Sequence, residues 1–235
     1  MTGRRFLAAL STDNHTLVID GEEHHHLARV MRARTGMEIE AVNGLGDWFR
    51  ARILRIGQQR IEAAVLQHEH EQRPPTRLIL APSGLKKRPM DLMLEKLCEL
   101  GVDEIVPVRF ERSDSDCAEQ VPDRWQRIAL QALKVNRRLW PTRIRAALSL
   151  EALIQSSSGI PARVVMEISG QSAPPEEQEP ILCVIGPPGD FTPRELAELR
   201  GAGFRPWRIN DGTLRSETAA IAAAAVFLQR LCRSS

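Results

Sequence analysis

The fold is decided by residues 181–227, ILCVIGPPGDFTPRELAELRGAGFRPWRINDGTLRSETAAIAAAAVF, which contain two successive units of strand, loop and helix. The first strand is predicted at residues 181–185, because an unbroken apolar run of this length is typical of a parallel strand buried on both faces. The second strand is predicted at residues 206–209. Ligands of open α/β sheets bind where loops leave the carboxyl ends of strands. Both loops are therefore candidate ligand sites, although each also suits an ordinary strand-to-helix connection.

The first loop, Gly186-Pro187-Pro188-Gly189, has the residues of a tight turn. Pro188 fixes φ and Gly189 accepts a positive φ, which suits the two central positions of a type II turn. Thr192 and Glu195 then predict a helix that begins with a capping box. The chain should therefore bend sharply after the first strand and expose backbone polar groups to a ligand.

The second loop, Asn210-Asp211-Gly212-Thr213, precedes a helix predicted from about Arg215 whose body is mostly alanine. Alanine has high helix propensity and little bulk, so another backbone can approach this helix closely. Arg215 would begin the helix just after the loop. Glu217 follows in the first turn, where the helix dipole favours a carboxylate.

A proline pair divides the chain into two predicted domains. Arg73-Pro74-Pro75-Thr76 indicates an extended linker, because proline and the residue before it disfavour helix. We place the boundary at Pro74, with one domain at residues 1–74 and the other at residues 75–235.

The first domain is predicted to be a small β-barrel. Asn43-Gly44 is a strong hairpin signal between two of its expected strands. A helix is predicted from Glu22 to Ala33, and strands are predicted at residues 17–19, 38–42, 48–54 and 60–65.

The second domain alternates strands and helices. Before the two units described above, strands are predicted at residues 78–81, 104–110 and 163–168, and helices at residues 88–100 and 122–137. This alternation predicts an α/β fold, with a parallel sheet covered by helices on its faces.

The composition is that of an ordinary globular chain: 235 residues, 43% apolar and 26% charged, with a net charge of +2. A chain of this length can bury one large core or two modest ones. The net charge alone does not indicate a nucleic-acid binder. Arginines nevertheless gather in the first domain and again at residues 134–145, and the arginine fork suits phosphate contacts. Solvated surface arginines are the alternative interpretation.

The cysteines at positions 98, 117, 183 and 232 lie far apart, without the spacing of a metal site. A reduced, cytoplasmic protein is the simplest interpretation, with Cys98 and Cys183 in the core. His24-His25-His26 cannot all face one ion from a regular element, so no metal is predicted. No apolar run is long enough to predict a membrane span or a secretion signal.

Several motifs follow one another in a specific order along the chain. Near the start stand Arg5-Phe6, His25-His26-Leu27 and Val30-Met31-Arg32, and in the middle Lys96, Glu99-Leu100-Gly101-Val102, Pro107 and Glu111-Arg112-Ser113. Gly186-Pro187-x-Gly189-x-Phe191-Thr192-x-x-Glu195 and Leu214-Arg215-x-Glu217-Thr218-Ala219 complete the series. Together they resemble the bacterial 16S ribosomal RNA uridine-N3 methyltransferases, knotted enzymes of the SPOUT class that use S-adenosylmethionine. The resemblance covers nearly all of the chain.

This resemblance implies methylation of N3 of a uridine in 16S ribosomal RNA of the small ribosomal subunit. It implies a PUA-like RNA-binding barrel at residues 1–74 and a SPOUT methyltransferase domain at residues 75–235, with a trefoil knot in the last part of its sheet. The family acts as a homodimer, in which one RNA site would combine the barrel of one protomer with the cofactor loops of the other.

The resemblance also implies roles for particular residues. Arg215 is the catalytic candidate, because a cation there could offset negative charge on the uracil ring or hold a phosphate; a surface ion pair with Glu217 is the alternative. The residues implied to surround S-adenosylmethionine are Glu167, Ile185, Gly186, Pro187, Gly189, Ile209, Asn210, Thr213, Leu214 and Thr218. Those implied to contact RNA, chiefly at phosphates, are Arg5, His25, Arg32, Lys86, Arg112 and Arg138, with Arg137 as the alternative match to Arg138.

The chain departs from the family in both loops. Pro188 and Asp190 stand where the family usually has glutamate and glycine, and Asn210 and Gly212 replace a usual glycine and arginine. The departures support a second interpretation, a non-catalytic RNA-binding or ribosome-assembly protein on the same scaffold. A third is an unrelated α/β enzyme that holds a nucleotide phosphate, which the absence of a Gly-x-Gly-x-x-Gly or Gly-Lys-Ser/Thr motif disfavours.

Overall fold

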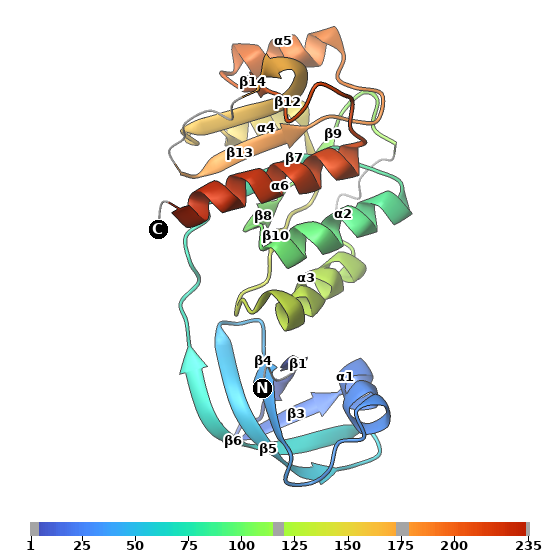
Figure 1. The fold of residues 1–235 in the computed structure, drawn as a ribbon, viewed down its shortest axis with the longest axis vertical. Coiled ribbons are helices and arrows are strands. Elements are labelled where there is room, and N and C mark those ends of the chain that lie inside the picture. The colour runs from blue at the N-terminus through green and yellow to red at the C-terminus, as the bar shows by residue number, and fades with distance from the viewer. Residues whose placement is uncertain (1–4, 115–119, 173–178, 234–235) are drawn as a thin grey trace. The chain divides into compact units, whose positions relative to one another are not determined.

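A computed structural model of the protein describes residues 5–114, 120–172 and 179–233 (Figure 1). Cys117 lies outside these residues. The chain forms two compact units: Met1–Pro74 with Leu130–Pro141, and Pro75–Ala129 with Thr142–Ser235. The first division of the chain falls at the proline pair. The grouping of residues 130–141 with the first unit has no counterpart among the sequence predictions.

Six strands build the first unit: β1 (Arg5–Leu7), β2 (Ala9–Leu10), β3 (Thr16–Asp20), β4 (Glu38–Val42), β5 (Asp47–Ile56) and β6 (Arg60–His70). They form one sheet in the order β1-β4-β5-β6-β3-β2, in which only β1 and β4 pair in parallel. β1 and β2 stand at opposite ends of this order, yet only Ala8 separates them in the chain. The sheet therefore closes on itself as a barrel.

The side chains of β5 alternate between the barrel core and the barrel surface. Phe49, Ala51 and Ile53 are buried in the barrel core. Arg50 and Arg52 point the other way and are exposed, as the two-residue period of a strand requires. The predicted small barrel is therefore the observed structure of the first unit, and along β5 its apolar residues face inward and its arginines outward.

The single helix predicted at residues 22–33 is wrong in detail. The structure has a short α-helix, α1 (Gly21–His25), that continues as a π-helix, η1 (His26–Val30). Arg32 then adopts a left-handed backbone with φ of 50°. The backbone N–H of Ala33 donates to the Leu27 carbonyl, six residues earlier, and this bond closes the wide turn that ends the π-helix. The helix stops at this left-handed arginine, where no glycine or proline had signalled an end.

Residues 130–141 join the first unit through specific polar contacts. They begin within α3 (Asp123–Asn136). Lys134 Nζ lies 2.6 Å from the buried Glu23 carboxylate. The Trp140 indole N–H donates to the Glu71 carbonyl at 2.8 Å, and the Arg73 guanidinium lies 5.0 Å from the centre of the Trp140 ring. Such partners, remote in sequence, cannot be read from local patterns.

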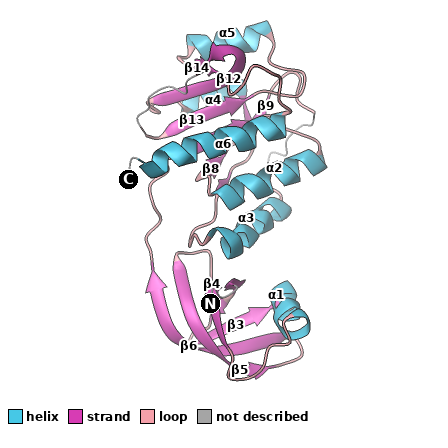
Figure 2. Ribbon diagram, viewed as in Figure 1, coloured by secondary structure: helices cyan, strands magenta, loops and turns pink. Residues whose placement is uncertain are grey.

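The second unit is an α/β layer structure (Figure 2). Its helices are α2 (Lys87–Leu100), α4 (Leu150–Ser156), α5 (Pro193–Gly201) and α6 (Ser216–Arg233), together with the start of α3. Its strands are β7 (Leu78–Pro82), β8 (Glu104–Ile105), β9 (Val108–Arg109), β10 (Arg143–Ile144), β11 (Leu148–Ser149), β12 (Ala162–Gln171), β13 (Ile181–Ile185) and β14 (Arg205–Trp207).

The main sheet is wholly parallel, in the order β10-β8-β7-β13-β12-β14. Helices cover both of its faces. On one side α6 contacts β7, β13 and α2, and Figure 1 shows α6 crossing this face. On the other side Leu182 and Val184 of β13 share a core with Leu153 of α4 and Leu199 of α5. The predicted α/β fold with a parallel, helix-covered sheet is confirmed.

The strand predicted at residues 104–110 is instead two strands in different sheets. β8 pairs with β7 and β10 of the main sheet, whereas β9 pairs with β11 in a separate two-stranded sheet. Pro107 lies between them. Proline has no N–H to donate to a ladder, and the chain changes partners at this residue.

The two predicted core cysteines, Cys98 and Cys183, are both fully buried. Burial raises the pKa of the Cys98 thiol to about 11, so this thiol stays protonated and unreactive at neutral pH. Among the helices that the structure describes, none is long and apolar enough to cross a membrane.

Candidate functional site

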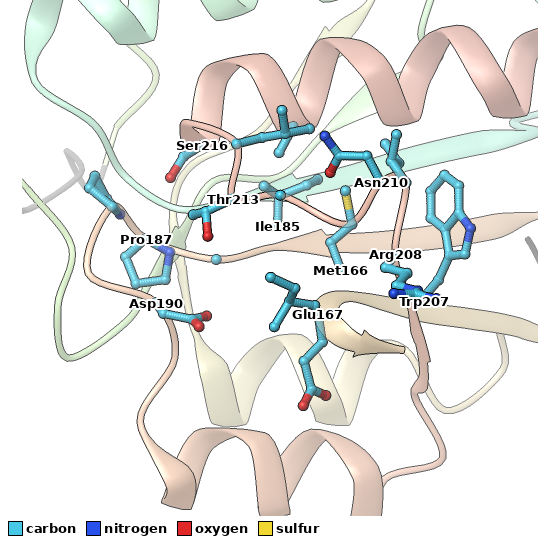
Figure 3. A pocket seen from close by; sticks show the side chains of 17 residues that line it. Met166, Glu167, Ile185, Pro187, Asp190, Trp207, Arg208, Asn210, Thr213 and Ser216 are labelled. Atoms are coloured by element: carbon cyan, nitrogen blue, oxygen red, sulfur yellow. The ribbon is translucent and has the colours of Figure 1, made fainter. Parts of the chain in front are cut away.

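A cavity opens beside three adjacent strands of the second unit, β12, β13 and β14, toward their carboxyl ends (Figure 3). Its empty volume is about 700 Å³, including the part open to solvent. Its walls come from the end of β12 and from the two loops that follow β13 and β14. Lining side chains belong to residues 166–168, 185–188, 190, 207–210, 212–214, 216 and 219.

Eight of the ten residues predicted to bind a cofactor line this cavity: Glu167, Ile185, Gly186, Pro187, Ile209, Asn210, Thr213 and Leu214. The other two do not. Gly189 lies in the exposed turn of the first loop, and Thr218 is exposed on the first turn of α6. The two loops singled out from the sequence thus share one cavity.

Other lining residues are missing from the predicted set. Pro188, Asp190, Gly212 and Ala219 were quoted in the loops or motifs but not among the named cofactor contacts. Met166, Ile168, Trp207, Arg208 and Ser216 were not named individually. Their positions in the chain could have identified them as lining residues. Each stands at a strand end, in a loop or in the first turn of a helix that the sequence had already placed at the site.

The turn in the first loop differs from the type II turn predicted. The Asp190 N–H donates to the Pro187 carbonyl at 2.9 Å, so Pro188 and Gly189 do occupy its centre. The residue with a positive φ, however, is Asp190, at 62°, and not Gly189. Aspartate reaches this left-handed region more readily than most residues, because its short side chain can bond locally. Here Asp190 Oδ1 accepts from the Phe191 N–H at 2.8 Å.

Neighbouring elements hold the first loop. Thr192 and Glu195 form the predicted capping box at the start of α5. The buried Glu195 carboxylate also accepts from the Glu111 N–H at 2.8 Å. Arg112 Nη1 donates to the Gly189 carbonyl at 2.8 Å. The loop is therefore tied both to α5 and to the segment after β9.

The second loop has fewer ties. Residues 210–213 are exposed and belong to no helix or strand. Arg208 Nη1 lies 2.6 Å from Asp211 Oδ1, but the Asp211 side chain is 90% exposed. Such an exposed ion pair adds little to stability.

Glu167 lines the cavity floor but turns its carboxylate away from it. Figure 3 shows this carboxylate pointing toward the helices below the cavity and away from the other labelled side chains. It accepts hydrogen bonds from Arg200 and Ser169. Burial alone would raise the pKa of Glu167, but the hydrogen bonds from Arg200 and Ser169 outweigh burial and hold the pKa below its usual range. A structural ion pair is the role this geometry supports.

Arg215 immediately precedes α6 and is exposed. It does not line the cavity, although Leu214 and Ser216 on either side of it do. Within the described chain its side chain makes no ion pair, so the predicted alternative of a surface pair with Glu217 is not observed. The guanidinium is therefore exposed, on a residue that stands between two lining residues in the chain.

The residues predicted to contact RNA differ in exposure. Lys86 and Arg112 are exposed in the second unit, and His25 and Arg32 are exposed in the first. Arg138 is half-buried. Arg5 is mostly buried, with 12% of its side chain exposed and its Nε 3.6 Å from Glu40. Across the described residues, no three His, Cys, Asp or Glu side chains lie together as a metal site.

Two family models match the chain and give its class. Residues 72–228 match the model of an RNA methyltransferase domain, and residues 19–66 match that of an RNA methyltransferase PUA domain. The first match contains every lining residue of the cavity, and the second falls within the barrel. The fold and the site are thus those of an RNA methyltransferase with a PUA domain.

Similar proteins refine this class. A protein of Aquifex aeolicus named ribosomal RNA small subunit methyltransferase E is 26% identical over 92% of this chain and 94% of its own length. Its namesake in Bacillus subtilis is 27% identical over 88% of each chain. The structure of a Neisseria gonorrhoeae protein of this name, bound to S-adenosylmethionine, aligns with a TM-score of 0.81 at 26% identity, over 97% of this chain and 98% of that one. The chain therefore belongs to the RNA methyltransferase family that includes the ribosomal RNA small subunit methyltransferases E.

Proposed function

We propose that the protein transfers a methyl group from S-adenosylmethionine to N3 of a uridine in 16S ribosomal RNA of the small subunit. The observation that carries this proposal is the cavity formed by the two loops, in a chain of this family. Relatives named as small-subunit methyltransferases, one of them bound to S-adenosylmethionine, support the choice of substrate and cofactor.

The lining suits such a cofactor. Ile185, Leu214 and Met166 supply apolar surface for an adenine ring. Gly186 and Ala219 add almost no side-chain bulk, which leaves loop backbone groups open to hydrogen bonds from the ligand. A mostly apolar cavity with a few polar groups is what small-molecule sites in general provide.

The bound cofactor would supply an electrophilic methyl group, and the chain must supply the rest. The uracil N3 proton has to leave, and negative charge then develops on the ring. Arg215 is exposed beside the cavity without an ion-pair partner among the described residues, so its guanidinium can stabilise that charge or fix a neighbouring phosphate. Water can accept the proton.

We assign RNA binding to the barrel and its arginines, within a domain at residues 1–74, and methyl transfer to a domain at residues 75–235. Arg5, His25, Arg32, Lys86, Arg112 and Arg138 remain the proposed RNA contacts. Phosphate contacts of this kind release counterions, so affinity should fall steeply with salt. Affinity for RNA that did not change between 50 mM and 200 mM salt would remove this assignment.

The proposed fold is a trefoil knot in a homodimer. The path of the chain supports the knot, because from β14 at the sheet edge it passes to α6, which packs across β13 and β7. Stretching single molecules from both ends should leave a knot that shortens the fully extended length. Light scattering after size-exclusion chromatography should give the mass of two chains.

The decisive experiment deletes the gene and maps modified uridines in small-subunit RNA by mass spectrometry. Loss of N3-methyluridine, with rescue by the wild type and little rescue by Arg215→Ala, is expected. Unchanged N3-methyluridine would refute the activity. Loss of ribosome assembly without loss of the modified base would instead support the non-catalytic RNA-binding protein.

A further inference from the structure

One charge in the cavity lining has no counter-charge. The charged lining residues are Glu167, Asp190 and Arg208. Glu167 is paired with Arg200, and Arg208 with Asp211. Asp190 forms no ion pair with any residue that the structure describes. Since the two pairs cancel, the lining keeps the single negative charge of Asp190.

The backbone and a local hydrogen bond fix where this charge lies. Asp190 sits in the left-handed region with φ of 62°. Its Oδ1 is held by the Phe191 N–H at 2.8 Å, which leaves Oδ2 for a ligand. Figure 3 shows the Asp190 carboxylate directed into the cavity, on the side of Thr213 and Pro187. The Glu167 carboxylate points away.

Two structural roles for Asp190 can be set aside. A helix cap is already provided by Thr192 and Glu195, which complete the capping box of α5. Partnership with the nearby cation Arg112 is not observed, because Arg112 donates to the Gly189 carbonyl instead. Asp190 therefore holds an exposed carboxylate beside the cavity, with one oxygen that a ligand of opposite charge can partner.

We propose that Asp190 is the counter-charge to the sulfonium of S-adenosylmethionine, and that it makes the chain prefer this cofactor over the product S-adenosylhomocysteine. The inference rests on the proposed function. In methyl transfer the S–CH₃ bond breaks and its electron pair stays on sulfur, which becomes a neutral thioether. The methyl bonds to uracil N3, whose proton leaves to water. The carboxylate therefore attracts the cofactor before transfer and loses its partner afterwards, which favours product release.

The test compares affinities for the two ligands in the full-length protein. Isothermal titration at low salt measures Kd for S-adenosylmethionine and S-adenosylhomocysteine in the wild type and in Asp190→Asn, which keeps the local hydrogen bond and the tolerance of positive φ. We expect the variant to bind S-adenosylmethionine about tenfold more weakly, because it loses the attraction of one unit charge that solvent partly screens at the exposed Asp190. Its affinity for S-adenosylhomocysteine should change less than about twofold.

Two further variants make the result specific. Asp190→Gly removes the charge and relieves the backbone, so it should show the same loss of discrimination with an intact thermal unfolding midpoint. Glu198→Gln removes an equal charge from the exposed pair with Arg194 on α5 and should leave the ratio of the two Kd values unchanged.

The outcomes separate this inference from the function on which it rests. A wild type that binds both ligands, with an Asp190→Asn variant whose two affinities fall equally or not at all, would overturn the role of Asp190 and leave the methyltransferase intact. A wild type that binds neither ligand at millimolar concentration would overturn both.

Discussion

The two loops that form the cavity differ in how firmly the rest of the second unit holds them. In residues 186–191, the Gly189 carbonyl is bonded by Arg112, and the adjoining helix start is fixed by the buried Glu195. In residues 208–215, the side-chain tie is an exposed pair between Arg208 and Asp211. The first loop is a preformed wall, whereas the second has few buried contacts to favour one conformation.

This difference teaches how a ligand would be bound. A preformed wall needs little ordering when a ligand arrives, but an exposed loop loses conformational freedom, and that loss weakens binding. Affinity should therefore depend on the shape of the first loop, and the ligand itself should order the second. Substitutions that act on one loop at a time can test this contrast.

The largest loss of stability is expected from Glu195→Ala, which removes the side chain that anchors the first loop. The change removes the capping box and leaves the backbone N–H groups of Glu111 and Thr192 without their carboxylate acceptor. We expect a loss of about 2–4 kcal/mol in unfolding free energy, measured by urea denaturation. Glu198→Ala, on the exposed side of the same helix, is the control and should leave the midpoint unchanged. Equally small losses of unfolding free energy in both variants would refute the conclusion that Glu195 anchors the first loop.

The same glycine-to-alanine change in each loop gives the most direct comparison. A Cβ at Gly186 would lie 2.8 Å from the ring of Phe191, which is itself packed edge-on against Phe110. A Cβ at Gly212 would meet nothing closer than 3.9 Å, the Asn210 amide. Gly186→Ala should lower the unfolding free energy by about 1–3 kcal/mol, and Gly212→Ala by less than about 0.5 kcal/mol. Thermal unfolding measures both variants, and equal losses of stability would contradict the difference between the two loops.

A smaller loss of stability is expected from Arg200→Gln, which removes the ion-pair partner of Glu167 at the cavity floor. Because the folded-state pKa of Glu167 is depressed by Arg200 and Ser169, its stabilisation is present above the ordinary carboxyl value of 4.5 and is lost as pH falls through the folded-state pKa. At pH 7 the variant should be less stable by about 1 kcal/mol. The difference from the wild type should shrink below pH 4.5. A difference that stayed constant from pH 7 to pH 3 would contradict this pairing.

The smallest effect is expected from Asp211→Ala in the second loop. Its partner Arg208 would lose an ion pair whose carboxylate is almost fully open to solvent, so the unfolding free energy should change by less than about 0.5 kcal/mol. Calorimetric unfolding measures it. A loss above about 1 kcal/mol would show that the second loop is anchored as firmly as the first.

Much of the second unit was predictable from short stretches of sequence. The strand at residues 181–185 matches β13 at both ends, because five consecutive apolar residues allow few other structures. The capping box of Thr192 and Glu195 was also predictable, since its hydrogen bonds lie within four residues. The location of the two cavity loops followed from these elements and from the general rule about strand ends.

Other features could not be predicted in this way. Residues 104–110 have the pattern of one strand, but the partners on either side of Pro107 belong to different sheets. The positive φ was expected at Gly189 because glycine has no steric penalty there, yet the surrounding contacts assign it to Asp190. Glu167 was expected to face the cofactor, and only the position of α5 explains why its carboxylate turns to Arg200.

The sequence by itself determined most of the strand and helix segments of the second unit and the family, because these depend on local propensity and on the order of motifs along the chain. The tertiary structure alone decided that residues 130–141 join the barrel, that eight of the ten predicted residues share one cavity, and that Asp190 is its unbalanced charge. The physical reason is that ion pairs, packing and cavities depend on groups far apart in the chain. No local pattern records which of those groups will meet.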